Sequence, residues 1–425
     1  MSSNNNASVK LSKKGSYVKK IWLHFVRDGE WFTWDRVSFA SGFTAFMLLI
    51  ALIYLFVLPN PFTSPNGTLL MDYLSFWLAG RQALTGTPEI VYHLDSFSEL
   101  QFQTTASDTV FAFFYPPTFQ LLQIPYSFLS AKIAHITFVT TTSIFLWYIL
   151  RAILRNALWA ACLVVIPASL SNAFHGQNAA LTAALYALFL INIERKQPVL
   201  AGIALGILTI KPQLGLLAPI ALIASYNWRC FASASITSIL LAGASLLVLG
   251  SEVWISFVGQ VPIASNVMQN GFVDWEKMIS LYSSLRQFGI NHTYSSTLQA
   301  CLGLVCLVCV VFAWHHTRDM TIRAPILIAG TLLTTPFALS YDLTLLIVPC
   351  AFLIRNGLEH GFLPYEKFIL AAFIVLSSST SSIAIQLGIP LAPLLPFIVF
   401  VLGLQRYFYY PSFSTQMKAT NTIKP

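Results

Sequence analysis

Apolar residues in this chain are grouped in long blocks and do not alternate with polar positions. The first block runs from Phe39 to Leu58 and is closed by Pro59 and Pro61. Twelve further blocks follow it: Phe113–Leu129, Ile133–Leu150, Ala157–Leu170, Ala179–Ile193, Val199–Ile210, Leu214–Tyr226, Phe231–Leu249, Leu298–Trp314, Ala324–Leu339, Leu343–Ile354, Phe368–Leu387 and Ile389–Leu404. Such blocks predict helices that cross a membrane, whereas a β-barrel needs alternation. We therefore expect an all-α polytopic membrane protein.

Several of these blocks are too short to cross a bilayer alone. A helix of about 13 residues is only about 20 Å long, against a hydrocarbon core of about 30 Å. Half-spans are tolerated in membranes where they line a polar cavity. Thirteen crossings would also place the two termini on opposite sides, although the basic residues near both ends favour the same side. We expect about twelve crossings, with half-spans around a polar cavity.

Composition and charge exclude other classes of protein. Only 9% of the 425 residues are charged and 56% are hydrophobic, whereas soluble proteins carry roughly 25% charged residues. A cytosolic enzyme and a disordered chain are therefore excluded. The net charge is +8, but seven basic residues precede Ser38 and most others lie at the ends of apolar blocks. This is the positive-inside distribution of a membrane protein, so we expect membrane lipids around the chain and no nucleic-acid partner.

The charge pattern predicts three regions. Residues 1–38 form a cytoplasmic basic segment, residues 39–405 form one transmembrane domain, and residues 406–425 form a cytoplasmic tail. Outer loops are expected at about 59–112 and 251–296. The first loop contains two amphipathic helix-like segments, Leu74–Leu84 and Phe97–Thr104, which are too short and polar to cross. We expect them to lie along the membrane surface.

Charged residues near membrane depth are costly and therefore candidates for function. Asp72 lies at the start of the segment Leu74–Leu84, where its side chain suits a helix N-cap as well as a catalytic role. Lys211, followed by Pro212, lies between two short blocks and suits either a snorkelling lysine or a phosphate ligand. Asp342 lies at another helix junction.

Other polar clusters leave similar alternatives open. The run from His175 to Asn178 suits a plain loop or a site for sugar hydroxyls, and the prolines after Tyr115 are typical of a helix start. Lys277 and Arg286 in the second outer loop suit an anion or simple solvation. The chain contains no GxSxG, HExxH or Walker motif.

Taken in order, these segments resemble the polytopic glycosyltransferases of family 87, in the GT-C superfamily. The matching residues are Met71-Asp72-Tyr73, Phe76-Trp77-Leu78-Ala79-Gly80, Tyr115-Pro116-Pro117-Thr118-Phe119, Gly176-Gln177-Asn178, Ala201-Gly202, Lys211-Pro212-Gln213, Lys277, Ser280, Leu285-Arg286 and Tyr341-Asp342-Leu343. The resemblance covers roughly residues 39–405. Asp72 stands alone where other GT-C branches often carry a paired acidic motif. The sequence therefore does not require a divalent metal, and we expect no cofactor.

The resemblance implies a GT-C-like bundle that performs inverting transfer of a mannose-like or other hexose or pentose sugar. The donor would be a polyprenyl-phosphate sugar and the acceptor a glycolipid or glycan on the non-cytoplasmic face. Asp72 would be the general base. Cationic side chains would stabilise the leaving phosphate. Lys211 and Arg286 are the preferred candidates for this role, and Lys277 and His175 are the weaker ones. The remaining candidates, expected to hold sugar hydroxyls or organise the cavity, are Gln177, Asn178, Tyr115 and Asp342.

We expect the protein in a bacterial inner (plasma) membrane, with both termini cytoplasmic, the active site periplasmic, and a role in cell-envelope polysaccharide or glycolipid biosynthesis. A polytopic transporter or lipid-linked-glycan flippase would share this composition, although the sequence shows no internal repeat. A ligase or polymerase of envelope polysaccharide would be expected to carry its essential residues in one large outer loop. Consumption of a polyprenyl-phosphate sugar by the purified protein distinguishes these classes.

Overall fold

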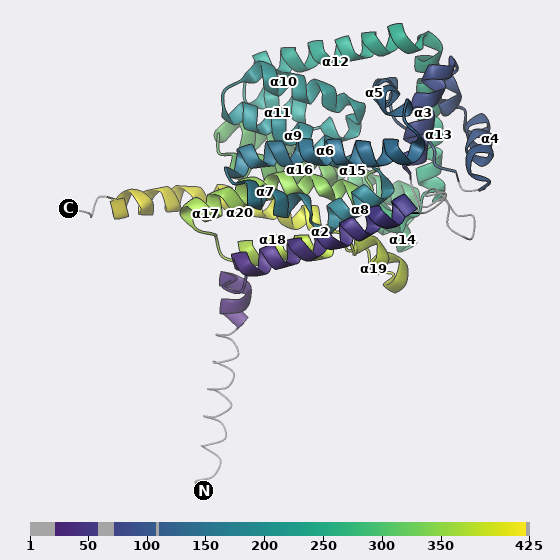
Figure 1. Ribbon diagram of the computed structural model, residues 1–425. Coiled ribbons are helices and arrows are strands. Elements are labelled where there is room, and N and C mark those ends of the chain that lie inside the picture. The colour runs from purple at the N-terminus through teal and green to yellow at the C-terminus, as the bar shows by residue number, and fades with distance from the viewer. Residues whose placement is uncertain (1–21, 58–71, 108–109, 422–425) are drawn as a thin grey trace.

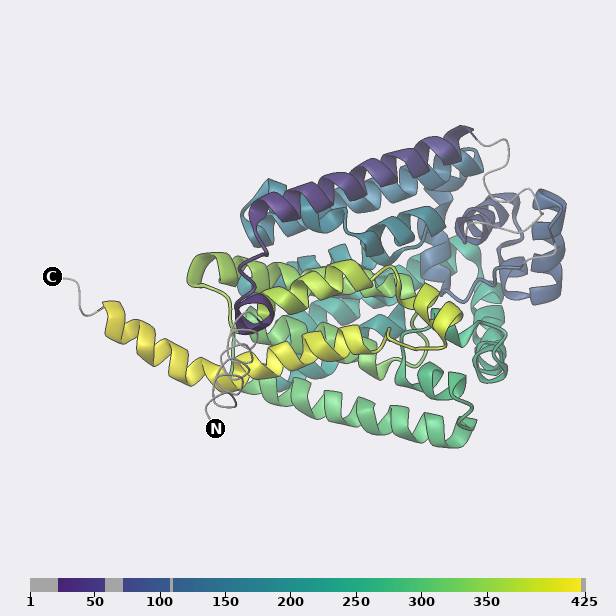
Figure 2. The same cartoon turned by 90° about the horizontal axis from the view of Figure 1, so that it is seen from below.

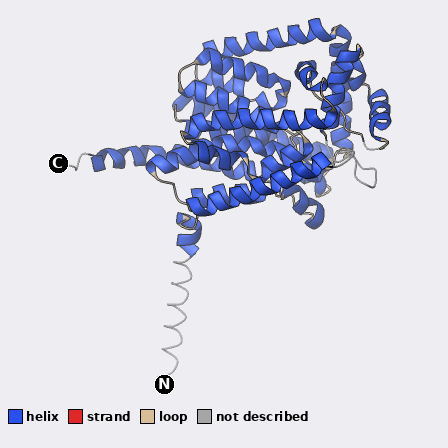
Figure 3. Ribbon diagram, in the orientation of Figure 1, coloured by secondary structure: helices blue, strands red, loops and turns tan. Residues whose placement is uncertain are grey.

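The computed structural model describes residues 22–57, 72–107 and 110–421. The start of the basic segment (1–21), the start of the first outer loop (58–71, including Met71), residues 108–109 and the last four residues of the tail lie outside this description. Within the described residues the regular elements are all helices, as Figure 3 shows, and one isolated antiparallel bridge joins Met278 to Leu339. The prediction of an all-α protein is confirmed.

The helices of the first half are η1 (Leu23–Asp28), α2 (Trp34–Val57), α3 (Tyr73–Thr85), η2 (Pro88–Tyr92), α4 (Leu94–Thr105), α5 (Pro117–Ser127), α6 (Ala131–Leu154), α7 (Ala157–Val164), α8 (Pro167–His175), α9 (Ala179–Glu194), α10 (Pro198–Ile207), η3 (Leu208–Ile210) and η4 (Pro212–Gly215). Those of the second half are α11 (Ala218–Ala224), α12 (Trp228–Leu249), α13 (Ser251–Asn270), η5 (Trp275–Lys277), α14 (Leu281–Gln287), α15 (His292–His316), α16 (Met320–Thr334), η6 (Ser340–Leu346), α17 (Ile347–His360), α18 (Glu366–Leu376), α19 (Thr380–Leu387) and α20 (Leu394–Asn421).

Five helical segments in the described part are long and apolar enough to cross a membrane: Trp34–Tyr54, Ala131–Leu154, Trp228–Leu249, His292–His316 and Ser340–His360. Two bent pairs, α7 with α8 and α18 with α19, raise the number to seven if each pair is one broken span. Five shorter apolar segments of 10–17 residues accompany them. The chain is therefore an integral membrane protein.

The bend between α7 and α8 shows how sequence divides an apolar block. The sequence predicted one block, Ala157–Leu170, but the chain bends by 58° between the two helices. Pro167 is the first residue of α8, and Ile166 before it takes the extended conformation at φ −66° and ψ 158°. The proline ring disfavours the helical conformation at the residue before it, so α7 cannot continue through Ile166 into α8.

The long helices run side by side along one direction, and α3, α4 and α13 gather at one end of this bundle (Figures 1 and 2). Helix α9 lies inside and is buried along most of its length, with Leu188 and its last two residues partly or fully exposed, which agrees with its continuously apolar sequence. By contrast, α12 exposes Ile239 at 70% and Leu247 at 88%. Such a surface suits contact with lipid tails.

The two segments predicted as outer loops contain helices of their own. Helices α3 and α4 confirm the predicted helical pieces Leu74–Leu84 and Phe97–Thr104. The segment 251–296, predicted as a polar loop, instead begins with the 20-residue helix α13. Its apolar residues Ile255, Val258 and Val261 recur every three residues and are exposed. This helical spacing was hidden by the polar residues between them.

Candidate active site

Asp72 lies directly before α3, but its side chain does not cap the helix. The residue has helical backbone angles, φ −69° and ψ −20°, and makes no side-chain bond to the first turn. Its Oδ2 instead accepts a hydrogen bond of 2.6 Å from Nε2 of Gln177. Its Oδ1 lies 3.8 Å from Nδ1 of His175, and the Asp72 side chain is 18% exposed. The N-cap alternative is therefore wrong for this side chain. The carboxylate instead faces a polar cluster and is partly exposed to solvent.

A tight turn after α8 brings His175 and Gln177 to Asp72. Gly176 ends α8 in the left-handed conformation, at φ +67°. A Cβ atom at Gly176 would lie 2.5 Å from Cβ of Tyr73 and 2.8 Å from Nε2 of His135. Both the backbone angle and the close approach therefore require glycine at this position.

Tyr115, just before α5, continues the hydrogen-bonded chain. Its hydroxyl donates to Oε1 of Gln177 at 3.2 Å, so Gln177 is held between Tyr115 and Asp72. Burial, together with the charges of Asp342 and Asp72, raises the pKa of Tyr115 well above its usual range. The hydroxyl therefore stays protonated at neutral pH and remains a donor. This fixes the Gln177 amide with its NH2 group toward the carboxylate.

Lys211 and Asp342 form a buried ion pair beside this chain. Nζ of Lys211 lies 2.6 Å from Oδ1 of Asp342, and the two side chains are 4% and 1% exposed. Nζ also lies 3.4 Å from Oδ1 of Asn178, and it faces the ring of Tyr341 at 5.2 Å. Because the ammonium is buried inside the protein, the snorkelling alternative for Lys211 is wrong. Removing one partner of a buried pair costs about 3–5 kcal/mol.

Asp342 is fixed from its other side by the backbone. Its Oδ2 accepts the N–H of Leu339 at 3.1 Å. Leu339 in turn bridges to Met278, and the N–H of Ile279 donates to the carbonyl of Ala338 at 2.9 Å. These backbone contacts hold the segment that carries η5 and α14 against residues 338–339, next to the Lys211–Asp342 ion pair.

Lys277 and Arg286 lie on this attached segment and have other partners. Lys277 makes an exposed ion pair of 2.8 Å with Asp274. The guanidinium of Arg286 donates to the carbonyls of Ile290 and Gln269 at 3.0 and 3.1 Å. Among the described residues its Nε is buried and has no hydrogen-bond partner. The structure thus brings Asp72, Tyr115, His175, Gln177, Asn178, Lys211 and Asp342 together, and it leaves Lys277 and Arg286 at the side of this cluster.

Two residues next to the cluster, His135 and Tyr341, were not among the candidate site residues named from the sequence. His135 stacks on Tyr73 with 5.0 Å between ring centres, and its Nε2 lies 2.9 Å from the carbonyl of Ala173. Its signal in the sequence was a polar residue inside the apolar block Ile133–Leu150. Tyr341 lies beside the predicted Asp342 and adds its ring to the surroundings of Lys211. Within the described ranges, no group of three or more His, Cys, Asp or Glu residues is arranged to hold a metal ion.

Comparison with known proteins gives one match. The model of glycosyltransferase family 87 matches residues 113–338, which is more than half of the chain. This range contains Tyr115, the His175–Asn178 turn, Lys211 and Arg286, whereas Asp72 and Asp342 lie outside it. No curated protein and no solved structure matches the chain. Together with the apolar helices and the polar cluster among them, the match shows that this chain is a membrane protein of glycosyltransferase family 87.

Proposed function

We propose that the protein transfers a hexose or pentose, with inversion, from a polyprenyl-phosphate donor to a lipid- or glycan-linked acceptor, and that Asp72 is the general base. The observation that carries this proposal is the environment of the Asp72 carboxylate. One oxygen is held by Gln177, while the other faces the more exposed imidazole of His175, whose side chain is 41% exposed. A carboxylate that is fixed through one oxygen, and whose other oxygen accepts no hydrogen bond from the described residues, suits proton transfer from a hydroxyl.

The reaction follows from this arrangement. The acceptor oxygen attacks the anomeric carbon of the donor from the side opposite the phosphate. The bond between that carbon and the phosphate oxygen breaks, and the phosphate leaves with the electron pair as polyprenyl phosphate. The acceptor proton passes to Oδ1 of Asp72, the oxygen that Gln177 does not hold. Attack from the opposite side inverts the anomeric configuration.

The cations divide into two groups by the burial of their side chains and of their partners. Lys211 is buried against Asp342, so we assign it to organising the polar cluster with Asn178 and Tyr115. Arg286 has an unpartnered Nε among the described residues, and Lys277 and His175 are partly exposed. Arg286 and Lys277 are the proposed contacts of the donor phosphate, whose charge grows as it leaves. His175 lies 3.8 Å from Oδ1 of Asp72, on the side of the attacking hydroxyl, so we assign it to positioning the base. This division differs from the sequence-based expectation, which placed Lys211 first among the phosphate ligands.

The proposed topology is a GT-C-like bundle of about twelve crossings in a bacterial inner membrane. Seven long or broken spans reach this number if the five shorter apolar segments also cross. Helix η1 and the end of α20 lie at the end of the bundle opposite α3 and α4 (Figure 1). With the basic residues before Ser38 on the cytoplasmic side, both termini are cytoplasmic and Asp72 faces the periplasm. The domain limits remain 1–38, 39–405 and 406–425.

The test is transfer by the purified full-length protein in lipid nanodiscs. Polyprenyl-phosphate mannose and a polyprenyl-phosphate pentose are each supplied with a glycolipid extract of the envelope, and products are analysed by mass spectrometry. We expect release of polyprenyl phosphate that depends on the acceptor, and a product of inverted anomeric configuration. Consumption of nucleotide sugars but of neither lipid-linked donor, or a product with retained configuration, would overturn the proposal.

A further inference from the structure

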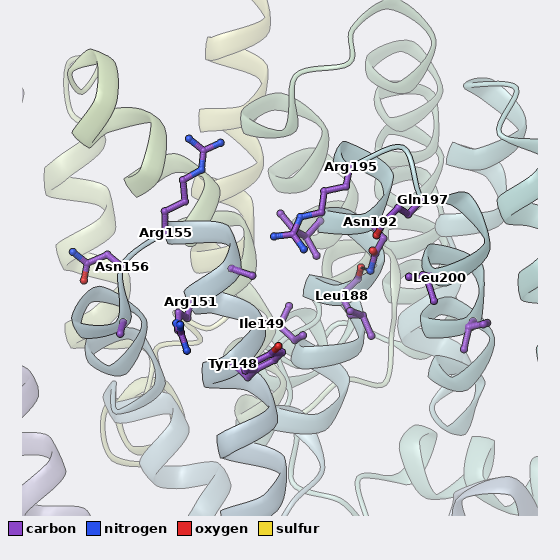
Figure 4. Close-up of a pocket in the computed structure, with 14 residues that line it drawn as sticks. Tyr148, Ile149, Arg151, Arg155, Asn156, Leu188, Asn192, Arg195, Gln197 and Leu200 are labelled. Carbon is purple, nitrogen blue, oxygen red and sulfur yellow. Dashed lines mark hydrogen bonds between the residues drawn. The ribbon is translucent and has the colours of Figure 1, made fainter.

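A basic pocket lies at the end of the bundle away from Asp72, between the ends of α6 and α9 and the starts of α7 and α10. It has a volume of about 750 Å³, within the range of pockets that take a drug-sized ligand. Three arginines line it, Arg151 and Arg155 from the end of α6 and Arg195 from the end of α9 (Figure 4). The pocket lies outside the cluster that contains Asp72, and the proposed function does not use it.

Two of the three arginines, Arg151 and Arg195, give this pocket a positive charge that no ion pair in the described part of the chain neutralises. The described residues that line it include no acid. Only Arg155 has an ion-pair partner, the exposed Glu359 at 3.3 Å. Arg151 faces the ring of Trp147 at 5.9 Å, and Arg195 makes no ion pair within the described part of the chain. Glu194, next to Arg195, is already bound by Arg355 at 2.9 Å. The pocket therefore favours an anion.

The rest of the lining is apolar and belongs to membrane helices. Leu200 and Ile203 of α10 are exposed at 51% and 38%, and Ile149 lies on α6. Asn192 and Gln197 add amide groups close to Arg195 (Figure 4). An inorganic phosphate ion would gain nothing from the aliphatic side chains. A phospholipid uses both parts, because its phosphate meets the arginines and its acyl chains lie along the aliphatic surface.

The position along α6 separates this pocket from the candidate active site. His135, which packs against Tyr73, lies near the start of α6, and Arg155 lies just past its end. Twenty residues of helix correspond to about 30 Å, the thickness of the hydrocarbon core. An occupant of the pocket therefore lies at the opposite membrane surface from Asp72 and is not the sugar donor in its reacting position.

We propose that this pocket, lined by Arg151, Arg155 and Arg195, binds the headgroup of an anionic phospholipid and that the lipid joins α6 and α7 to α9 and α10. Basic pockets between membrane helices at the cytoplasmic surface are suited to such headgroups. The bound lipid acts on the stability of the bundle, and it takes no part in sugar transfer.

The experiment uses the full-length protein in a mild detergent. Phosphatidylglycerol, phosphatidylcholine or inorganic phosphate is added stepwise, and binding is followed by native mass spectrometry and by the melting temperature. We expect phosphatidylglycerol to bind and to raise the melting temperature more than phosphatidylcholine does, and phosphate alone to have no effect. Arg151→Gln and Arg195→Gln should each weaken phosphatidylglycerol binding about fivefold, and the double variant about thirtyfold. Arg229→Gln, an exposed arginine at the start of α12 outside the pocket, is the matched control.

The possible outcomes distinguish binding of an anionic phospholipid from binding of inorganic phosphate and from misfolding of the variants. If the Arg151→Gln, Arg195→Gln double variant binds phosphatidylglycerol like the unchanged protein, or if phosphatidylcholine binds equally well, the proposal is overturned. Full stabilisation by inorganic phosphate alone would also overturn it, in favour of a phosphate site. The double variant with lysine at both positions keeps the charge and should retain most of the lipid binding. This variant shows whether a loss in the glutamine variants comes from charge or from misfolding.

Discussion

Gln177 donates a hydrogen bond of 2.6 Å to Asp72, a residue 105 positions earlier in the chain. The bond occupies one carboxylate oxygen, and the hydroxyl of Tyr115 fixes the amide from behind. A carboxylate held in this way has one free oxygen in a defined direction. The relationship supports the proposed role of Asp72 as the general base, which the sequence alone did not separate from that of a helix cap.

Asp72→Asn and Asp72→Ala are both expected to lower turnover by roughly 10²-fold or more, because neither side chain accepts the acceptor proton. The protein level and donor binding should remain, as measured by size-exclusion chromatography and by binding of a labelled lipid donor. Asp95→Asn is the control, since Asp95 is an exposed acid in the first turn of α4. An active Asp72→Asn enzyme would end the assignment and move the search for the base to Asp342.

Changes at the buried ion pair test the role of Lys211. Lys211→Gln leaves the Asp342 carboxylate buried without its cation, so we expect a loss of about 3–5 kcal/mol in stability. The double change Lys211→Gln with Asp342→Asn removes both charges and should recover most of that loss. If Lys211 only organises the cavity, the double variant regains measurable transfer. Recovery of stability without recovery of donor binding would instead make Lys211 a phosphate ligand.

Gly176→Ala tests the turn that carries His175 and Gln177. The new Cβ would overlap Cβ of Tyr73, the residue after Asp72, and would displace the base. A displacement of about 1 Å can lower a rate on the order of 10²-fold. Gly86→Ala is the control, because Gly86 has φ +87° and open space around it. Both variants carry backbone strain, but only Gly176→Ala should lose turnover. Equal losses would mean that strain alone is responsible.

Cysteine labelling tests the proposed orientation. Ser96→Cys in α4 should react with a membrane-impermeant maleimide in intact spheroplasts, because Ser96 is exposed at the end of the bundle that carries Asp72. Lys196→Cys, in the exposed turn between α9 and α10 at the opposite end, should react only after the membrane is opened. The signal of the unsubstituted protein is subtracted in each case. Labelling of Lys196→Cys in intact spheroplasts would reverse the orientation.

The sequence predicted the apolar elements more closely than their breaks. The predicted block Ala179–Ile193 corresponds to helix α9 (Ala179–Glu194). A helix that is apolar on all its faces is expected to be buried, and α9 is. Block Phe368–Leu387 instead divides into α18 and α19 with a bend of 67°. This break contains only Ser377 to Ser379 and no proline. Packing against other helices decides such a bend, and a single sequence does not contain that information.

The candidate site was predicted by residue type but not by partner. Asp72, Gln177, Lys211 and Asp342 were all identified as polar residues at membrane depth, and the structure places them in one cluster. That Lys211 pairs with Asp342 was not predictable, because 131 residues separate them and no local spacing relates them. His135 was missed because one histidine in an apolar block has no motif around it.

The separation of Lys211 and Asp342 also has a consequence for biosynthesis. Chains are synthesised at about 5–20 residues per second, so the 131 residues between the two partners correspond to roughly 7–26 s. During this interval the lysine has been synthesised and its counter-ion does not yet exist. A lone ammonium is poorly tolerated in hydrocarbon. We therefore expect the segment between α10 and α11, which carries Lys211, to stay in a hydrated environment until η6 has been synthesised, so that the buried pair forms only at that late stage.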